Sequence, residues 1–246
     1  MKTFLHRILD SISSGNIKIL ALELTIVATG LVIGFQIDRM YEQYRDNQLA
    51  EQYIQRLTDD IQSDLDNLVN VHDAASFRKF ATETIYASIN DLEIPASNPG
   101  LYIVSLEQAI YRFSLVSQHA TYNELLSTGE LNLLPVPVRI SLHEYYGRVA
   151  VWEQFDAAED FIQDQSYQRF AGILLPEHIQ GAMSRDVDMP VTREEAMAAA
   201  HRFREKQEAI EWIPRLRAQH VGAIRVANEL SALAEAALGQ LEQFSE

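Results

Sequence analysis

The chain has 246 residues, is 47% apolar, contains no cysteine and carries a formal net charge of −15. This composition excludes a disordered chain, a disulfide framework, a cysteine-based zinc site and a covalently attached c-type haem. The acidic charge also argues against nucleic acid as a partner.

An almost entirely apolar stretch covers residues 19–37, with the sequence ILALELTIVATGLVIGFQI. Its nineteen residues would rise roughly 28 Å as a helix, at about 1.5 Å each, close to the roughly 30 Å hydrocarbon core of a bilayer. Charged residues interrupt the only comparable stretch, residues 221–241. We therefore expect one transmembrane helix, over residues 19–37.

The charges that flank this stretch predict its orientation. Residues 1–18 form a short amphipathic segment with a positive balance, whereas residues 38–46 have a negative one. The positive-inside rule places residues 1–18 in the cytoplasm and residues 38–246 in the periplasm, as a single-pass protein of the inner membrane. The alternative is a cleaved signal peptide, because Ala28-Thr29-Gly30 resembles a cleavage site; the apolar run, however, continues to Ile37.

One face of the predicted span carries small and polar residues. Glu23, Gly30 and Gly34 are seven and four residues apart and share this face. Gly30 and Gly34 form a GxxxG pattern, which lets two helices approach closely in lipid; Thr25 and Thr29 add small side chains nearby. Glu23 has two interpretations: a shallow position near the headgroups, or a protonated or hydrogen-bonded group that faces another helix.

A long helix is predicted to continue out of the span. After residue 37 neither glycine nor proline occurs before Pro95, and we expect helix over residues 17–91. Its apolar seam has an average spacing near 3.5 residues, typical of a bundle or coiled-coil helix. The seam consists of Ile54, Leu57, Ile61, Leu65, Leu68, Val71 and Ala75.

The rest of the chain predicts further helices and no strands. We expect a loop over 94–100, a helix over 104–116, and a short helix opened by a Thr121–Glu124 capping box and closed by Gly129. A second loop over 132–137 precedes a helix over 138–175.

Residues 176–191 are predicted to form an irregular linker. A second capping box, Thr192 to Glu195, starts a helix that extends to about residue 210, and Pro214 is expected to break or kink it. A last helix extends to about residue 244. The fold class is all-α: one N-terminal transmembrane helix that continues into a long helix, plus a periplasmic helical bundle.

Several segments resemble an uncharacterised bacterial family, a domain of unknown function. They are ELTIV at 23–27, GLVIGFQIDR at 30–39, YIQRL at 53–57, and a central motif over 121–131 and 139–146. Met40 stands where the family has a tryptophan. The resemblance covers roughly residues 20–150 and implies a single span with a periplasmic helical domain; it implies no activity.

No residue pattern indicates a metal or a cofactor. The seven histidines include none at the ExxH spacing of bundle di-metal sites and no HExxH motif. His72, His143 and His220 are interpreted as hydrogen-bonded structural residues rather than ligands, with a bis-histidine haem in the bundle as the alternative. The acidic cluster Asp59, Asp60, Asp64 and Asp66 is interpreted as a solvated face, with a cation site as the alternative.

Asp64 nevertheless occupies a seam position, where we expect it to pair with Arg139. The stretch over residues 122–129 is interpreted as a capped helical turn, and as a possible partner surface through Tyr122, Glu124 and Arg139. Ser127 lacks the Gly-x-Ser-x-Gly context of hydrolases.

Two further groups are predicted to be structural. They are an aromatic core stripe, Tyr145, Tyr146, Trp152 and Phe155, and basic residues paired with acidic helices of the same chain or of another subunit, Arg202, Arg204, Lys206, Arg215 and Arg217.

The sequence therefore predicts a non-catalytic, membrane-anchored helical scaffold or accessory subunit of a larger membrane complex. Its partners would be the lipid bilayer and other membrane subunits, or a second copy of itself through the span. The alternative is a ligand-binding, sensor-like periplasmic module. No cofactor is expected.

Overall fold

The computed structural model describes residues 17–112, 114–158 and 160–244. All regular secondary structure in these residues is helical, which confirms the all-α class. The chain divides into two compact units, Met1–Tyr53 and Ile54–Glu246. The amphipathic segment predicted over residues 1–18 lies almost entirely outside the described residues.

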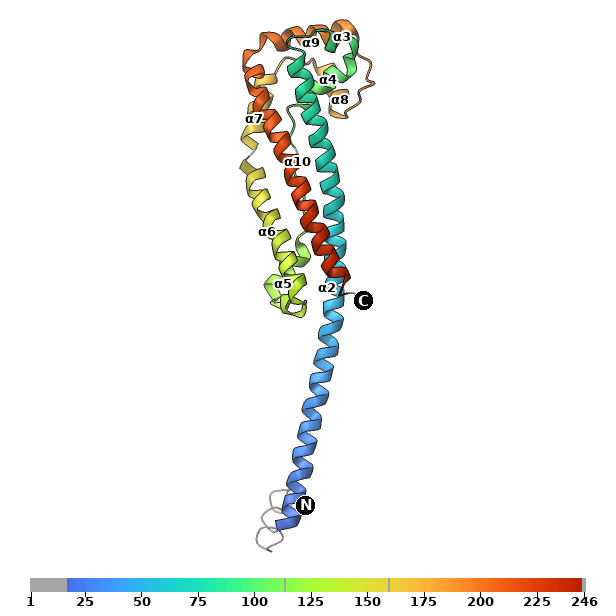
Figure 1. Ribbon diagram of the computed structural model, residues 1–246, viewed down its shortest axis with the longest axis vertical. Helices are drawn as coiled ribbons and strands as arrows, with labels where there is room; N and C mark the ends of the chain where they lie inside the picture. The colour runs from blue at the N-terminus through green and yellow to red at the C-terminus, as the bar shows by residue number, and fades with distance from the viewer. Residues whose placement is uncertain (1–16, 113, 159, 245–246) are drawn as a thin grey trace. The chain divides into compact units, whose positions relative to one another are not determined.

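Helix α2 covers Ile17–Ala87 and contributes to both units (Figure 1). It contains no proline, and its two glycines lie in the apolar stretch, so its backbone hydrogen bonds continue from one turn to the next. The long helix predicted over residues 17–91 is therefore confirmed, and it ends at Ala87. In the first unit, every side chain from residue 24 to residue 45 is exposed.

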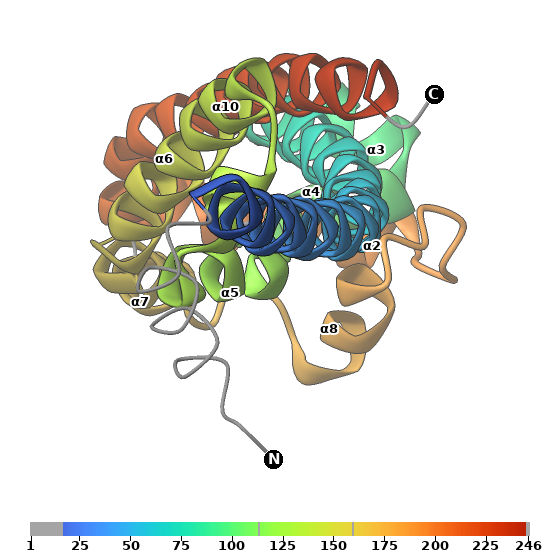
Figure 2. The same ribbon diagram turned by 90° about the horizontal axis from the view of Figure 1, so that it is seen from below.

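The second unit is a helical bundle formed by α2, α6 (Val136–Ala158), α7 (Asp160–Phe170) and α10 (Gln207–Glu242). Helix α10 lies alongside α6 in both views (Figures 1 and 2). The seam of α2 is buried in this bundle as predicted, except that Leu65 is half-buried and Asp64 is completely buried. The bundle thus buries a carboxylate at a position where an apolar side chain would be expected.

Helices α3 (Glu93–Ser97), α4 (Pro99–Gln108), α8 (Pro176–Met183) and α9 (Arg193–Glu205) gather at one end of the bundle (Figure 1). They share a hydrophobic core with the C-terminal end of α2 and the first turns of α10. Helix α5 (Ala120–Thr128) and the 3-10 helix η1 (Glu130–Leu133) lie toward the opposite end.

Three predictions about loops and helices before residue 136 are wrong. Residues 94–100 are not a loop, because Pro99 starts α4 and the Asn98 side chain caps it. The helix predicted over 104–116 ends at Gln108, and no helix is described from residue 111 to residue 119. Side chains satisfy the backbone there: Gln163 accepts from the Arg112 N–H at 2.7 Å and donates to the Ile110 carbonyl at 3.0 Å.

The Thr121–Glu124 capping box is also wrong. Helix α5 starts at Ala120 instead, and His119 at its N-cap makes no side-chain capping bond. The Glu124 carboxylate accepts a hydrogen bond from Arg56 at 2.6 Å, so it serves a contact with α2. Gly129 closes the helix in the left-handed conformation, with φ of 77°, as predicted.

In the C-terminal half, the linker predicted over 176–191 contains α8, and the helix predicted over 138–175 is described as α6 and α7. The capping box of Thr192 and Glu195 is confirmed at the start of α9. The break that was one alternative at Pro214 is wrong: α10 continues through this exposed residue, and the helical structure is interrupted instead at Lys206. Burial of Ile213 and Leu216 on either side of the proline offsets the hydrogen bond that it cannot make.

Candidate functional site

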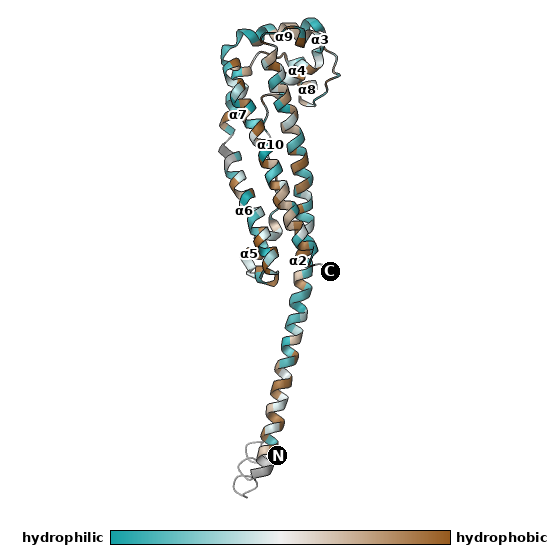
Figure 3. Ribbon diagram, viewed as in Figure 1, coloured by the Kyte–Doolittle hydropathy of each residue, from teal (hydrophilic) through white to brown (hydrophobic). Residues whose placement is uncertain are grey.

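The first unit presents an uncovered apolar helix. It is long and apolar enough to cross a membrane, and its most apolar window of 18 residues has no part buried in the protein (Figure 3). The Thr25 hydroxyl donates to the Ala21 carbonyl at 2.8 Å, and the Thr29 hydroxyl donates to the Thr25 carbonyl at 2.7 Å. These two polar side chains are therefore satisfied within the helix, as an apolar environment requires.

The face of Glu23, Gly30 and Gly34 is open at the two glycines, whereas Glu23 is half-buried. A Cβ atom added at either glycine would meet nothing within 4 Å. Within the described part of the chain, Glu23 Oε2 has no hydrogen-bond partner. The glycines thus have no packing role inside the described fold, and any role in close helix approach would be toward another molecule.

The three residues predicted as a partner surface lie on α5 and α6. Tyr122 is buried, and its ring stacks on Tyr146 with the centroids 4.4 Å apart. Glu124 pairs with Arg56, and the Arg139 guanidinium donates to the Asn132 side chain at 3.0 Å. Glu124 and Arg139 remain half-exposed, so a role at a partner surface stays a prediction for these two side chains.

Asp64 does not pair with Arg139, and that prediction is wrong. Its carboxylate accepts three hydrogen bonds, each of 2.7 Å, from the Ser117 hydroxyl, the Gln118 backbone N–H and the Tyr145 hydroxyl. Three donors satisfy the buried carboxylate without a cation. Burial and the bond to Asp64 raise the pKa of Tyr145 well above its usual range, so this tyrosine stays a donor. The remaining residues of the acidic cluster are exposed or half-exposed.

Arg112 forms a second polar centre, which no sequence motif predicts. Its guanidinium contacts Asp156 at the end of α6 and Asp160 at the start of α7, each at 2.5 Å. The Ser114 hydroxyl also donates to Asp156. Arg112 thus ties the non-helical segment after α4 to two helices. Arg112 is 44 and 48 residues away from these two acids in the sequence, so no local motif could predict the contact.

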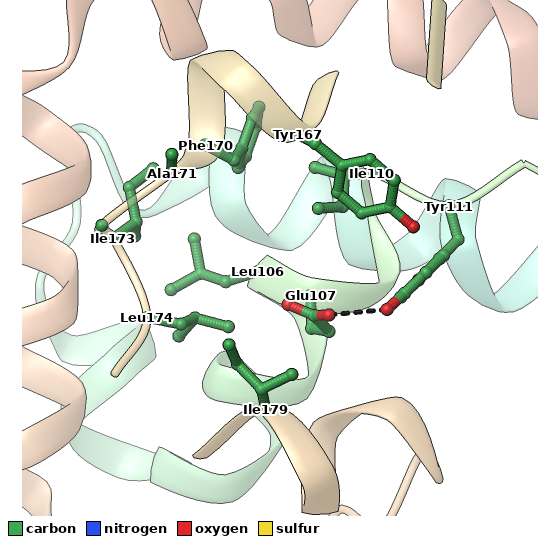
Figure 4. A pocket seen from close by; sticks show the side chains of 11 residues that line it. Leu106, Glu107, Ile110, Tyr111, Tyr167, Phe170, Ala171, Ile173, Leu174 and Ile179 are labelled. Atoms are coloured by element: carbon green, nitrogen blue, oxygen red, sulfur yellow. Dashed lines mark hydrogen bonds between the residues drawn. The ribbon is translucent and has the colours of Figure 1, made fainter. Parts of the chain in front are cut away.

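A pocket of about 280 Å³ lies between α4, the end of α7 and α8 (Figure 4). Its apolar lining comes from Leu106, Ile110, Phe170, Ile173, Leu174 and Ile179. Glu107 is the carboxylate among the lining residues and is only 7% exposed. The Tyr111 hydroxyl donates to Glu107 Oε1 at 2.7 Å. Burial raises the pKa of Glu107, and the hydrogen bond from Tyr111 opposes that shift.

The described residues bring no metal site together: no three His, Asp or Glu side chains in them converge on one point. His220 is buried and lies 3.0 Å from the Ala109 carbonyl oxygen. Burial lowers the pKa of His220 to about 4, so the neutral ring donates from Nε2. His72 is part-exposed and contacts its neighbour Asp73 at 3.2 Å.

The predicted pairing of the basic cluster with acidic helices holds in one case. Arg217 pairs with Glu83 of α2 at 2.9 Å. Arg202 and Lys206 instead donate to the carbonyl oxygens of Ile173 and Ala171, just after α7. These two residues therefore hold the turn that follows α7. In the aromatic stripe, Tyr145 and Tyr146 are in the core and Trp152 is half-buried, whereas the side chain of Phe155 lies outside the described ones.

Comparison with known proteins finds no matching family, no matching curated protein and no matching solved structure. The candidate site therefore consists of the features of this chain alone. They are the open face of Glu23, Gly30 and Gly34, and the pocket around Glu107.

Proposed function

We propose that this chain is a membrane-anchored helical scaffold, or accessory subunit, of a larger membrane protein complex. The observation that carries the proposal is the first unit: a helix whose apolar stretch is exposed over residues 24–37, with an open small-residue face. An exposed apolar surface of this length is stable only when it is buried, and lipid together with another span would bury it.

The proposed topology has the N-terminus in the cytoplasm and the second unit in the periplasm of a bacterial inner membrane. The positive balance of residues 1–18 and the negative balance after the span support it. A reporter enzyme that works only in the periplasm should show activity when it is fused after residue 246. A reporter active only in the cytoplasm should be silent there, and the opposite pattern would contradict this topology.

Purification in a mild detergent tests the scaffold role. The full chain, tagged at its C-terminus, should retain a membrane protein partner, or a second differently tagged copy, in a fixed ratio through size-exclusion chromatography. Mass spectrometry then gives the partner and its stoichiometry. A monodisperse chain without any partner in fixed ratio, at the lowest detergent concentration that extracts it, would contradict the proposal.

A ligand-binding, sensor-like module is the second candidate function. The Glu107 pocket favours it, because an apolar cavity with a single convergent polar group is the usual form of a small-molecule site.

A further inference from the structure

The pocket around Glu107 contains an acidic group, and its lining contains no basic residue. None of the residues that line the pocket is a lysine or an arginine. Among the described residues, no cationic side chain forms an ion pair with Glu107, and Tyr111 is the hydrogen-bonding partner of its carboxyl group. The other acids with little exposure in this fold have several donors: Asp64 accepts three hydrogen bonds, and Asp156 faces Arg112 and Ser114.

An ionised carboxylate in an apolar cavity is costly unless a positive charge or several donors compensate it. One hydroxyl at Oε1 leaves the second oxygen of Glu107 without such compensation from the protein. Burial raises the pKa of Glu107, which is the physical signature of this missing compensation. A cation that entered the pocket would supply the compensation.

The surroundings of the carboxyl group also favour a cation. Figure 4 shows the rings of Tyr111 and Tyr167 next to one another at one side of the pocket, and their centroids are 6.0 Å apart. The face of an aromatic ring attracts cations, and the Tyr111 ring already makes one such contact, with the Arg78 guanidinium 5.8 Å from its centroid. The formal net charge of −15 raises the local concentration of cations around the protein and lowers that of anions.

The shape of the pocket defines the remainder of the ligand. Leu106, Leu174 and Ile179 lie on the side of the carboxyl group away from Tyr111 (Figure 4). They offer no partner to a second polar group, so the body of the ligand should be apolar. A volume of about 280 Å³ is near the small end of the range for ligand pockets.

From this arrangement we propose that the pocket binds a small organic cation, an ammonium group on a compact apolar body, with the ammonium group donating to Glu107. The inference goes beyond the scaffold function and does not depend on it, because every residue of the pocket belongs to the second unit.

Benzylammonium and benzyl alcohol test the proposal, since they differ in charge but hardly in shape. Each is titrated calorimetrically into the full chain in detergent, with the heat of the empty micelles subtracted. Benzylammonium should bind the wild type saturably and at least about tenfold more tightly than benzyl alcohol does. Glu107→Gln should remove this preference, whereas Glu144→Gln, the same loss of charge at an exposed position of α6, should keep it.

Ala171→Phe provides a test that leaves the carboxyl group in place. Ala171 lines the pocket with an exposed side chain, so a phenyl group should fill the cavity from its rim without entering the core. Benzylammonium binding should be lost while circular dichroism stays unchanged. Three outcomes would overturn the proposal: no binding of benzylammonium to the wild type, equal binding of amine and alcohol, or equal binding of the amine to the wild type and to a folded Glu107→Gln or Ala171→Phe variant.

Discussion

The carboxylate of Asp64 and the hydroxyl of Tyr145 lie 2.7 Å apart inside the bundle, although 81 residues separate them along the chain. Asp64 also holds Ser117 and the backbone of Gln118, so one buried side chain of α2 connects α6 with the segment before α5. Removing either partner leaves buried polar atoms unpaired, which costs more than the bond itself contributes.

Asp64→Asn should therefore lower the free energy of unfolding of the second unit by about 1–3 kcal/mol, because the amide offers one acceptor where the carboxylate serves three donors. Urea unfolding followed by circular dichroism measures this. Tyr145→Phe should cost less, about 1 kcal/mol, and the double variant should cost less than the sum. Asp66→Asn, at an exposed position, is the matched control. Equal effects at positions 64 and 66 would refute the role of Asp64.

The elements that the sequence predicted correctly are those with strong local signals. The long helix α2 contains no glycine or proline after Gly34, and the Thr192–Glu195 capping box is a local motif. The loop predicted over 94–100 is wrong although Asn98 and Pro99 form a local start signal for α4, whereas the early end of the helix predicted over 104–116 depends on a distant side chain. Gln163 stabilises the non-helical segment after α4 from 51 and 53 residues away, and no local pattern shows it. The candidate sites differ in the same way. The face of Glu23, Gly30 and Gly34 could be predicted from spacing along one helix, whereas the Glu107 pocket is formed by α4 and two elements that are distant from it in the sequence.

The stability of the fold should depend on the protonation of His220. The ring is neutral in both states above pH 6.5. As the pH falls below about 6.5, the unfolded chain takes up a proton, and the folded chain does not until the pH approaches about 4. Stability should therefore decrease by about 1.4 kcal/mol per pH unit in this window, by about 3 kcal/mol in total, and level off below it.

His220→Gln isolates this contribution, because the glutamine amide can donate to the Ala109 carbonyl but does not titrate. The difference in unfolding free energy between wild type and variant, measured from pH 7.5 to pH 4, should follow the predicted curve. A difference that does not change with pH would show that His220 has the same pKa in the folded and unfolded chain.

Gly100 should tolerate no side chain, because a Cβ atom there would overlap the carbonyl oxygen of Val187. This contact is backbone against backbone, so it cannot relax by a change of rotamer. Gly100→Ala should destabilise the second unit by about 1–3 kcal/mol in thermal or urea unfolding. Gly147→Ala is the matched control in α6, where a Cβ atom meets nothing within 4 Å and helix propensity favours alanine by about 0.5–1 kcal/mol. Destabilisation of both variants to the same extent would contradict the steric account.

The central claim is that the face of Glu23, Gly30 and Gly34 packs against another span. Ile37 lies seven residues from Gly30 and therefore on the same face. Since the chain has no native cysteine, Ile37→Cys provides a single attachment point for a photo-activated cross-linker. The cross-linked partner is identified by mass spectrometry in native membranes.

The most direct measurement is the yield of this cross-link in the Gly30→Ile and Gly34→Ile variants. A Cβ atom at these positions meets nothing within the chain, so the variants should keep the fold and lose only the close approach of a partner helix. The yield should fall several-fold in both variants and stay unchanged in Val32→Ile, on the opposite side of the helix. A wild-type yield in both glycine variants, or no cross-linked protein in the parent chain, would show that this face meets only lipid and would contradict the scaffold function.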